Sequence, residues 1–222
     1  KMQGGVPRSQ LSVPDLAALR AGAANLERHV RNLQQFGLTP VVCINRFPDD
    51  TVEEMSLVQS ISESLGVRAV PADHWALGGE GATELAQAVL DQMDEGTPEV
   101  NFLYEDSLPL ADKIRTIATR IYYAGSVEFT TVAKRQLEEY ESLGFGHLPV
   151  CIAKTQYSFS ADSSVKGAPS GHTLPVREVR LAAGAGFVVA VCGDIMTMPG
   201  LPRHPAALDI ALDDNGLVMG LT

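Results

Sequence analysis

Cysteine is scarce in this sequence and is not spaced for a metal site or a disulfide framework. The 222 residues hold three cysteines, Cys43, Cys151 and Cys192, and no C-x-x-C pair. An odd and sparse set of this kind is typical of a reducing compartment and gives no support to structural zinc. We therefore expect a fold held by its core, with no metal site.

Long apolar runs and an excess of positive charge are also missing. No run approaches the roughly 20 apolar residues that span a bilayer, and no charged, then apolar, leader opens the chain. Seventeen Lys and Arg stand against 27 Asp and Glu, so the net charge is −10 and the pI is near 4.9. Such an acidic chain is unsuited to coating nucleic acid or an anionic membrane. The sequence predicts a cytoplasmic protein with no nucleic-acid partner and no membrane.

Common catalytic motifs are absent. The phosphate-binding pattern G-x-x-x-x-G-K-[ST] does not occur, and Lys154-Thr155 lacks the glycines that would precede it there. Neither G-x-S-x-G nor H-E-x-x-H occurs, and the five histidines are scattered singly. The glycines of residues 184–186 lie between two predicted strands, which favours a tight turn over a dinucleotide loop. We predict no catalytic residue and no metal ligand in this chain.

The residues that are present suffice for a sizeable core. Apolar residues make up 45% of the chain, enough for one large or two small cores. The charge is uneven, because residues 1–112 hold 7 basic and 17 acidic residues whereas residues 113–222 hold 10 of each. This asymmetry indicates two structural units. The chain also begins with Lys1 instead of Met, so we expect it to be a piece of a longer protein.

Helix and strand signals alternate in the first half of the chain. Asp15 follows Ser12 and Pro14 as a helix-start signal, and apolar residues recur at spacings of three and four as far as Gly37. Further along, the pattern predicts buried strands over 38–44 and 67–72, a helix over 51–66 opened by a Thr51–Glu54 capping box, and a helix from Thr83 to about Met93. Such alternation favours a parallel sheet.

A linker and a unit of mixed character follow. Residues 94–109 combine Gly96, Pro98 and Pro109 with polar residues, which makes this segment the best linker in the chain. Beyond it the pattern predicts helices over 114–121 and 132–144 and short strands over 149–153, 174–181, 187–192, 208–212 and 217–221. The triplet 214–216, Asp-Asn-Gly, is typical of a type I′ hairpin turn. The expected fold class is α/β, a small parallel-sheet domain followed by a mixed α+β domain.

Two aromatic residues follow neighbouring strands of the predicted parallel sheet. Phe47-Pro48 comes after the first strand, and Trp75, the sole tryptophan, comes after the second. Open α/β sheets bind ligands at this carboxyl edge, where two rings can stack on a flat heteroaromatic ligand. A lone aromatic packs under its own loop about as often. Two on adjacent strand ends favour a ligand.

Two further loops are compatible with binding an anion. The glycine-rich stretch 78–81 can direct backbone N–H groups at one point, although a plain turn explains it equally well. A predicted strand is directly followed by Lys154, Thr155 and hydroxyl groups up to Ser160, which can contact phosphate or carboxylate. A solvated loop rich in hydroxyl groups explains the same residues equally well. Residues 198–202, Met-Pro-Gly-Leu-Pro, predict a rigid type II turn.

Four extended blocks carry a resemblance to a known family. They are VCINRFPDDT (residues 42–51), HWALGGEG (74–81), LPVCIAKTQYS (148–158) and TMPGLP (197–202). In this order the sequence resembles formate–tetrahydrofolate ligase from its first residue to its last. Gln3 stands where that family usually has His or Asn, Leu77 where it usually has a charged residue, and Tyr123 where it usually has glycine.

The resemblance implies a function and a set of binding residues. The family joins formate to tetrahydrofolate with ATP, which implies Mg and an upstream ATP-binding domain, and its members are implied to be homo-oligomers. For this chain it implies an aromatic pair, Phe47 and Trp75, that holds the pterin ring, with Pro48, Gly78 and Gly79 beside it. For Lys154 and Thr155 an anion or phosphate contact is expected. The ATP loop would lie in a part of the enzyme that this chain lacks.

The resemblance also suggests a domain division. Residues 1–37 would be a helical segment continuing from a missing upstream domain, residues 38–109 the folate-binding α/β domain, and residues 110–222 an α+β C-terminal domain. The whole would belong to a larger P-loop-containing α/β enzyme. The function expected is therefore the C-terminal, folate-binding portion of the ligase, inactive by itself. The alternative is a non-catalytic folate-binding or assembly module derived from that enzyme.

Overall fold

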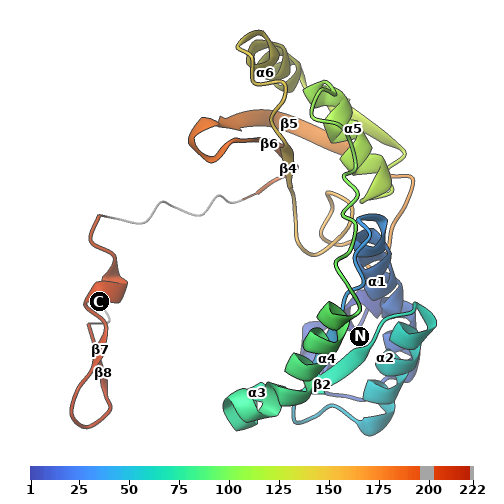
Figure 1. The fold of residues 1–222 in the computed structure, drawn as a ribbon, viewed down its shortest axis with the longest axis vertical. Helices are drawn as coiled ribbons and strands as arrows, with labels where there is room; N and C mark the ends of the chain where they lie inside the picture. Colours follow the sequence, from blue (N-terminus) through green and yellow to red (C-terminus); the bar gives the residue numbers. More distant parts are fainter. Residues whose placement is uncertain (196–202, 221–222) are drawn as a thin grey trace.

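The chain forms two α/β units joined by one long helix and an extended segment (Figure 1). The computed structural model describes residues 1–195 and 203–220. The turn predicted over residues 198–202 lies outside the described residues. A small two-stranded unit lies at the bottom of the view, a four-stranded unit lies at the top, and α1 and the segment after α4 run between them.

The two-stranded unit contains the parallel sheet expected from the sequence. Strands β1 and β2 pair in parallel, from Val42 opposite Ala69 to Asn45 opposite Ala72. The elements of this unit are β1 (Val42–Asn45), α2 (Val52–Ser64), β2 (Ala69–Ala72), α3 (His74–Leu77), η3 (Gly78–Ala82) and α4 (Thr83–Asp94). The prediction of a buried first strand was wrong, because β1 alternates between half-buried and exposed residues and has β2 as its one partner among the described strands.

Helix α1 (Leu16–Gln35) begins as the sequence predicts, but its neighbour α2 departs from the expected capping box. The Asp15 carboxylate accepts a hydrogen bond from the Ala18 N–H at 2.8 Å, and Thr51 Oγ1 accepts one from the Glu54 N–H at 3.2 Å. The Glu54 side chain does not return to Thr51. It is buried, accepts from the Asp15 N–H at 3.0 Å and pairs with Lys1 Nζ at 2.9 Å. One carboxylate thus ties α2 to the start of α1.

The four-stranded unit has a mixed sheet in the order β3-β5-β6-β4. Strand β5 pairs in parallel with β3 and antiparallel with β6, and β6 pairs in parallel with β4. The elements are α5 (Leu110–Arg120), β3 (Ser126–Phe129), α6 (Thr131–Ser142), β4 (Val150–Ala153), β5 (Thr173–Ala182), η4 (Ala183–Ala185) and β6 (Phe187–Cys192). The sequence pattern did not predict β3. The tight turn predicted between β5 and β6 is confirmed, with Gly186 in the left-handed region at φ 74°.

The main core lies between this sheet and helices α5 and α6. It is built from Leu110, Ile114, Ala118, Ala133, Leu137, Leu174, Val176, Val179, Val188 and Ala190, with Ala124 and Cys192. These side chains come from both helices and from the two central strands, so neither helix has a buried face without the sheet. The mixed α/β character expected for this half is confirmed, while the domain boundaries stay a prediction.

Lys113 is a charged residue inside this unit. Its side chain is fully buried, and its ammonium group donates to the carbonyl oxygens of Asp106, Gly146 and Leu148 at 2.7, 2.8 and 3.0 Å. Burial lowers the pKa of Lys113 because the interior solvates the charge less well than water. All three N–H groups of the ammonium are used. Lys113 therefore fixes the end of the extended segment to the loop before β4.

The C-terminal hairpin forms, but with a different turn from the one predicted. Strands β7 (Ala211–Leu212) and β8 (Val218–Met219) pair antiparallel after a short helix, η5 (Ala206–Leu208). A type I′ turn needs positive φ at two central residues. Here Gly216 has φ 78° and Asn215 does not have positive φ. The Asp213 carboxylate accepts hydrogen bonds from the N–H groups of Asn215 and Leu217, and these stabilise a longer loop.

Tyr123 has an unusual backbone conformation. Its φ of 54° makes it the one non-glycine residue with positive φ among the described residues. The Tyr123 carbonyl oxygen accepts from the Gly171 N–H at 2.8 Å, and the guanidinium carbon of Arg28 lies 3.7 Å from the centre of the Tyr123 ring. The turn therefore adopts the glycine-like conformation although a tyrosine occupies it, and a cation–π contact holds that tyrosine.

Replacing Tyr123 should separate the backbone effect from the side-chain effect. Tyr123→Gly and Tyr123→Ala both remove the ring, but only glycine tolerates positive φ without strain, so we expect the Gly variant to be more stable by about 1 kcal/mol. Urea unfolding followed by circular dichroism measures the difference. Tyr157, a half-exposed tyrosine without positive φ, is the control, and there the Ala variant should equal or exceed the Gly variant. Equal free energies of unfolding for the Tyr123→Ala and Tyr123→Gly variants would show that positive φ at residue 123 causes no backbone strain.

Removing the Lys113 ammonium should be costly. Lys113→Met leaves three buried carbonyl groups without their donor, and we expect a loss of about 3 kcal/mol in the free energy of unfolding. Lys134→Met is the matched control, since Lys134 is exposed on α6 and its loss should cost less than about 0.5 kcal/mol. Equal effects of the two substitutions would show that Lys113 has no special structural role.

Candidate functional site

The parallel register of β1 and β2 brings two loops to one edge of the sheet. Because Asn45 lies opposite Ala72, the residues that follow each strand emerge side by side. The Arg46 N–H donates to the Ala72 carbonyl at 3.2 Å, and Arg46 Nη1 lies 3.0 Å from Asp73 Oδ2. This ion pair joins the two loops. Sequence reasoning missed Arg46, although opposite charges directly after two adjacent parallel strands are a readable signal.

The first loop holds Phe47 in a fixed turn. The Phe47 N–H donates to Asp50 Oδ2 at 2.8 Å, and the Asp50 N–H donates to the Phe47 carbonyl at 3.0 Å. A carboxylate that bonds to the backbone three residues earlier closes the turn around Pro48. The Phe47 side chain is still 62% exposed. The loop therefore holds the backbone of Phe47 while leaving its ring in solvent.

The second loop is more ordered than predicted. Trp75 lies on the short helix α3, and the glycine-rich stretch 78–81 forms the 3₁₀ helix η3 instead of an open loop. Gly78 has φ 61° and ψ −140°, a conformation that is readily available to glycine alone. The Asp73 N–H donates to the Gly81 carbonyl oxygen. A Cβ atom at Gly81 would lie only 2.5 Å from the carbonyl oxygen of Asp73. Here glycine allows two backbone segments to approach closely.

Phe47, Pro48 and Trp75 meet at one cavity of about 320 Å³. The cavity is lined by Arg46, Phe47, Pro48, Asp73, Trp75, Ala76 and Leu77. Trp75 is 81% exposed, so both rings present apolar surface to water. Exposed aromatic groups around a cavity are typical of a binding site. Gly78 and Gly79, expected beside the same cavity, are not among its lining residues.

Lys154 and Thr155 lie in the other unit, just after β4. The Lys154 ammonium donates to the Thr155 carbonyl at 2.9 Å and to the Ser158 carbonyl. Thr155 Oγ1 accepts from the Tyr157 N–H at 3.3 Å. Burial lowers the pKa of Lys154. The loop is therefore folded around its lysine, and contact with an anion stays a prediction.

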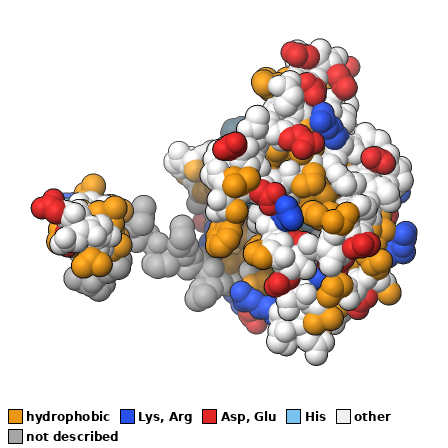
Figure 2. Space-filling view, turned by 90° about the horizontal axis from the view of Figure 1, so that it is seen from below, with side chains coloured by type: hydrophobic (Ala, Val, Ile, Leu, Met, Phe, Trp, Pro, Cys, Tyr) orange, Lys and Arg blue, Asp and Glu red, His pale blue; other side chains and the backbone are white. Residues whose placement is uncertain are grey.

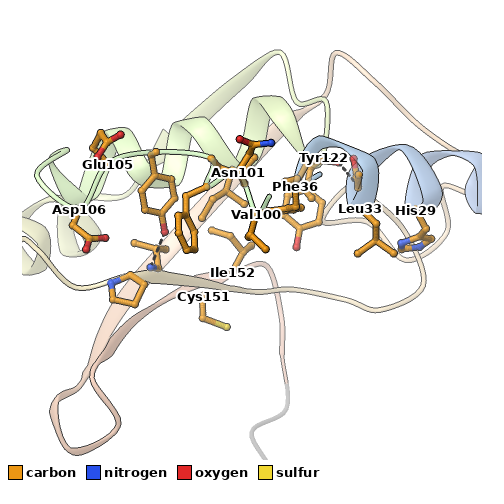
Figure 3. A pocket seen from close by; sticks show the side chains of 18 of the residues that line it. His29, Leu33, Phe36, Val100, Asn101, Glu105, Asp106, Tyr122, Cys151 and Ile152 are labelled. Carbon is orange, nitrogen blue, oxygen red and sulfur yellow. Dashed lines mark hydrogen bonds between the residues drawn. The ribbon is translucent and has the colours of Figure 1, made fainter. Parts of the chain in front are cut away.

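A larger cavity of about 1190 Å³ lies between α1, the extended segment, α5 and β4 (Figure 3). Its walls are mostly apolar and include Leu33, Phe36, Val100, Tyr122 and Ile152. His29 lies at one end in Figure 3, and Glu105 and Asp106 lie at the other. The cavity thus has an imidazole at one end and two carboxylates at the other. Sequence reasoning did not identify it, because its residues come from four separate segments.

No group of three or more His, Cys, Asp or Glu side chains is placed to hold a metal ion within residues 1–195 and 203–220. Within the same ranges, no helix combines the length and apolar character needed to cross a bilayer.

Comparison with known proteins identifies the family. The sequence model of the formate–tetrahydrofolate ligase family matches residues 1–222. The chain is 58% identical over 221 residues to the formate–tetrahydrofolate ligases of Maricaulis maris and Paracoccus denitrificans, and 55% identical to that of Allorhizobium ampelinum. In each case the match covers 100% of this chain but 40% of the relative. The chain therefore belongs to the formate–tetrahydrofolate ligase family and spans about 40% of the length of these relatives.

Proposed function

We propose that this chain is the C-terminal, folate-binding portion of an enzyme that joins formate to tetrahydrofolate with ATP, giving 10-formyltetrahydrofolate. The observation that carries the proposal is the exposed pair Phe47 and Trp75 at one cavity in a chain of this family. In this proposal the two rings hold the pterin ring between them, and Pro48 fixes the turn that positions Phe47.

The chemistry of the cavity suits a flat, polar heteroaromatic ring. Its volume of about 320 Å³ lies in the range of small-molecule sites, and stacking adds about 0.5–1.5 kcal/mol per aromatic pair beyond the area buried. Arg46 supplies hydrogen-bond donors and Asp73 supplies acceptors from the same wall. A pterin carries amino donors and a carbonyl acceptor on its edge. The two aromatic rings are therefore complementary to the faces of a pterin ring, and the Arg46–Asp73 pair is complementary to its polar edge.

The two-stranded unit also has the surface of an incomplete domain. Parallel sheets are almost always covered on both faces, yet Cys43 and Asn45 of β1 are exposed. Exposed apolar side chains occur on the same unit at Val52, Leu90 and Met93, and Figure 2 shows apolar groups over this lower face. We propose that the upstream ATP-binding domain of the same enzyme covers this surface. ATP and Mg would bind there, and homo-oligomers would form from the complete enzyme.

Folate binding can be measured through the single tryptophan. Tetrahydrofolate should quench Trp75 fluorescence in a saturable manner, and Phe47→Ala should weaken the affinity about tenfold because one stacking face is lost. Phe102→Ala is the matched control, since Phe102 is an exposed phenylalanine outside this cavity. Quenching that is identical in the Phe47→Ala variant would reflect absorption by the ligand alone and would refute the ring clamp.

Catalytic activity should be absent from the isolated chain. The phosphate-binding pattern does not occur in the 222 residues, so we expect no ATP-dependent formation of 10-formyltetrahydrofolate, measured by its absorbance after acid conversion, even when tetrahydrofolate binds. A full-length relative assayed in parallel verifies the assay. Steady formylation by the isolated chain would overturn the proposal that ATP binds in another part of the enzyme. Light scattering on the same sample tests the alternative, a non-catalytic folate-binding or assembly module, because a monomer that binds tetrahydrofolate would argue against assembly.

A further inference from the structure

Four basic side chains lie near one another, and one of them, His29, lines the larger cavity. Arg28 and His29 come from α1, Lys154 from the loop after β4, and His172 from the residue before β5. We refer to these four residues as the basic cluster. Burial, followed by the nearby charges of Lys154 and Arg28, lowers the pKa of both His29 and His172. Arg28 and Lys154 carry the positive charge of the basic cluster, whereas the lowered pKa values keep the two imidazoles uncharged at neutral pH.

Aromatic rings hold the basic cluster together. The Phe159 ring lies 4.7 Å from the His29 ring, centroid to centroid, and 5.3 Å from the Arg28 guanidinium carbon. Lys154 Nζ lies 5.0 Å from the centre of the Tyr122 ring. Cation–π contacts of this length stabilise a positive charge but do not neutralise it. The cluster is therefore a built arrangement that retains its charge.

No carboxylate neutralises the basic cluster within the described residues. None of the four side chains forms a salt bridge there. Arg28 donates instead to the carbonyl oxygens of Ala168 and Pro169, and Lys154 donates to two carbonyl oxygens. An ammonium group has three N–H donors, so one donor of Lys154 has no partner among residues 1–195 and 203–220. The fold orients these cations and leaves them able to bind an anion.

His172 provides an independent observation. Both of its ring nitrogens are shielded from solvent and have no hydrogen-bond partner among the described residues. Buried polar atoms almost always have a partner, because an unmade hydrogen bond costs free energy. A neutral imidazole has one N–H donor and one acceptor nitrogen, and the Arg28 and Lys154 side chains are donors only, so they cannot satisfy the His172 N–H. An acceptor that reaches this N–H and the Lys154 ammonium group together would satisfy both donors.

Of the basic cluster, His29 lines the wall of the larger cavity together with Tyr122 and Phe159, whereas Arg28, Lys154 and His172 are not among the lining residues. Figure 3 shows that Glu105 and Asp106 lie at the opposite end, away from His29. A negatively charged ligand in this cavity would thus be attracted toward the cluster and repelled from the other end.

We propose that the basic cluster of Arg28, His29, Lys154 and His172 binds an oxyanion, a phosphate or carboxylate group, at the end of the larger cavity. This site is separate from the ring clamp at Phe47 and Trp75. It does not depend on folate binding. An oxyanion accepts several hydrogen bonds at once, from the ammonium group and from imidazole N–H groups.

Binding of an oxyanion should be linked to protonation of the two histidines. A bound negative charge favours the charged imidazole, so ligand raises both pKa values, and affinity increases as the pH falls through them. The other titratable groups that face the cluster are Tyr122, Tyr123 and Cys192. Burial raises the pKa of Cys192 to about 12, and it also raises that of Tyr122. These two groups stay neutral in the range where the histidines titrate.

The test is a histidine NMR titration of the whole chain with inorganic phosphate, and in a second arm with formate. We expect saturable shifts of the His29 and His172 ring signals and a rise of both pKa values, while His74, His147 and His204 respond to neither ligand. Whichever anion saturates at the lower concentration identifies the chemical class. Sodium chloride at equal ionic strength is the reference. Equal responses from all five histidines, or equal responses to chloride, would show that the shifts come from ionic strength and not from a specific site. Either result would overturn the proposal.

Substitutions locate the effect in the basic cluster. Arg28→Gln and Lys154→Met should each weaken phosphate binding at least tenfold. Arg177→Gln, which removes an exposed arginine already paired with Asp194, should leave the affinity unchanged. Unaltered phosphate affinity in both cluster variants would refute the site. If a variant unfolds, the comparison among the five histidines of the unaltered chain still decides. A negative tetrahydrofolate titration would leave this result untouched.

Discussion

Hydrogen bonds from one helix to backbone carbonyls hold the two units together. From α1, Asn25 donates to Gly167, Arg28 to Ala168 and Pro169, Asn32 to Ile121, and Gln35 to Arg120. Backbone carbonyls have fixed positions, so these bonds set where the four-stranded unit lies along the helix. The walls of the larger cavity and the meeting of Arg28 and His29 with Lys154 and His172 follow from that placement. A helix with apolar contacts alone would permit more ways of packing.

The ring clamp depends on a second constraint, the parallel register of β1 and β2. Parallel strands end at the same edge, so residues that are 28 positions apart, Phe47 and Trp75, reach one cavity without any direct bond between them. The Arg46–Asp73 ion pair then joins the loops. An exposed pair contributes little to stability. Its value lies in orienting both loops and in presenting donors and acceptors beside the rings.

Local patterns were sufficient for the longer helices, the parallel pair and the aromatic residues of the smaller cavity, but not for the short helices α3 and η3. Asp15 and Thr51 cap helices because their side chains bond within three residues, which a linear pattern records. Glu54 could not be placed in this way, since its partners Lys1 and Asp15 are distant in sequence. The exposure of β1 was unpredictable for the same reason, because an apolar run does not reveal how many strands flank it. The basic cluster combines three segments whose proximity is a property of the tertiary fold.

Lys113 and Lys154 show how a buried charge with a structural role differs from one that can bind a ligand. Both lie close to aromatic rings and donate to backbone carbonyls, and burial lowers the pKa of both. Lys113 is fully buried and donates its three N–H groups to three carbonyl oxygens, so it has no donor left to bind another molecule. Lys154 is half-buried, donates to two carbonyl oxygens, and lies near Arg28 and near His172, whose ring has no hydrogen-bond partner among residues 1–195 and 203–220. Hydrogen-bonding capacity that the fold leaves unused, and not positive charge itself, distinguishes the lysine that can bind a ligand.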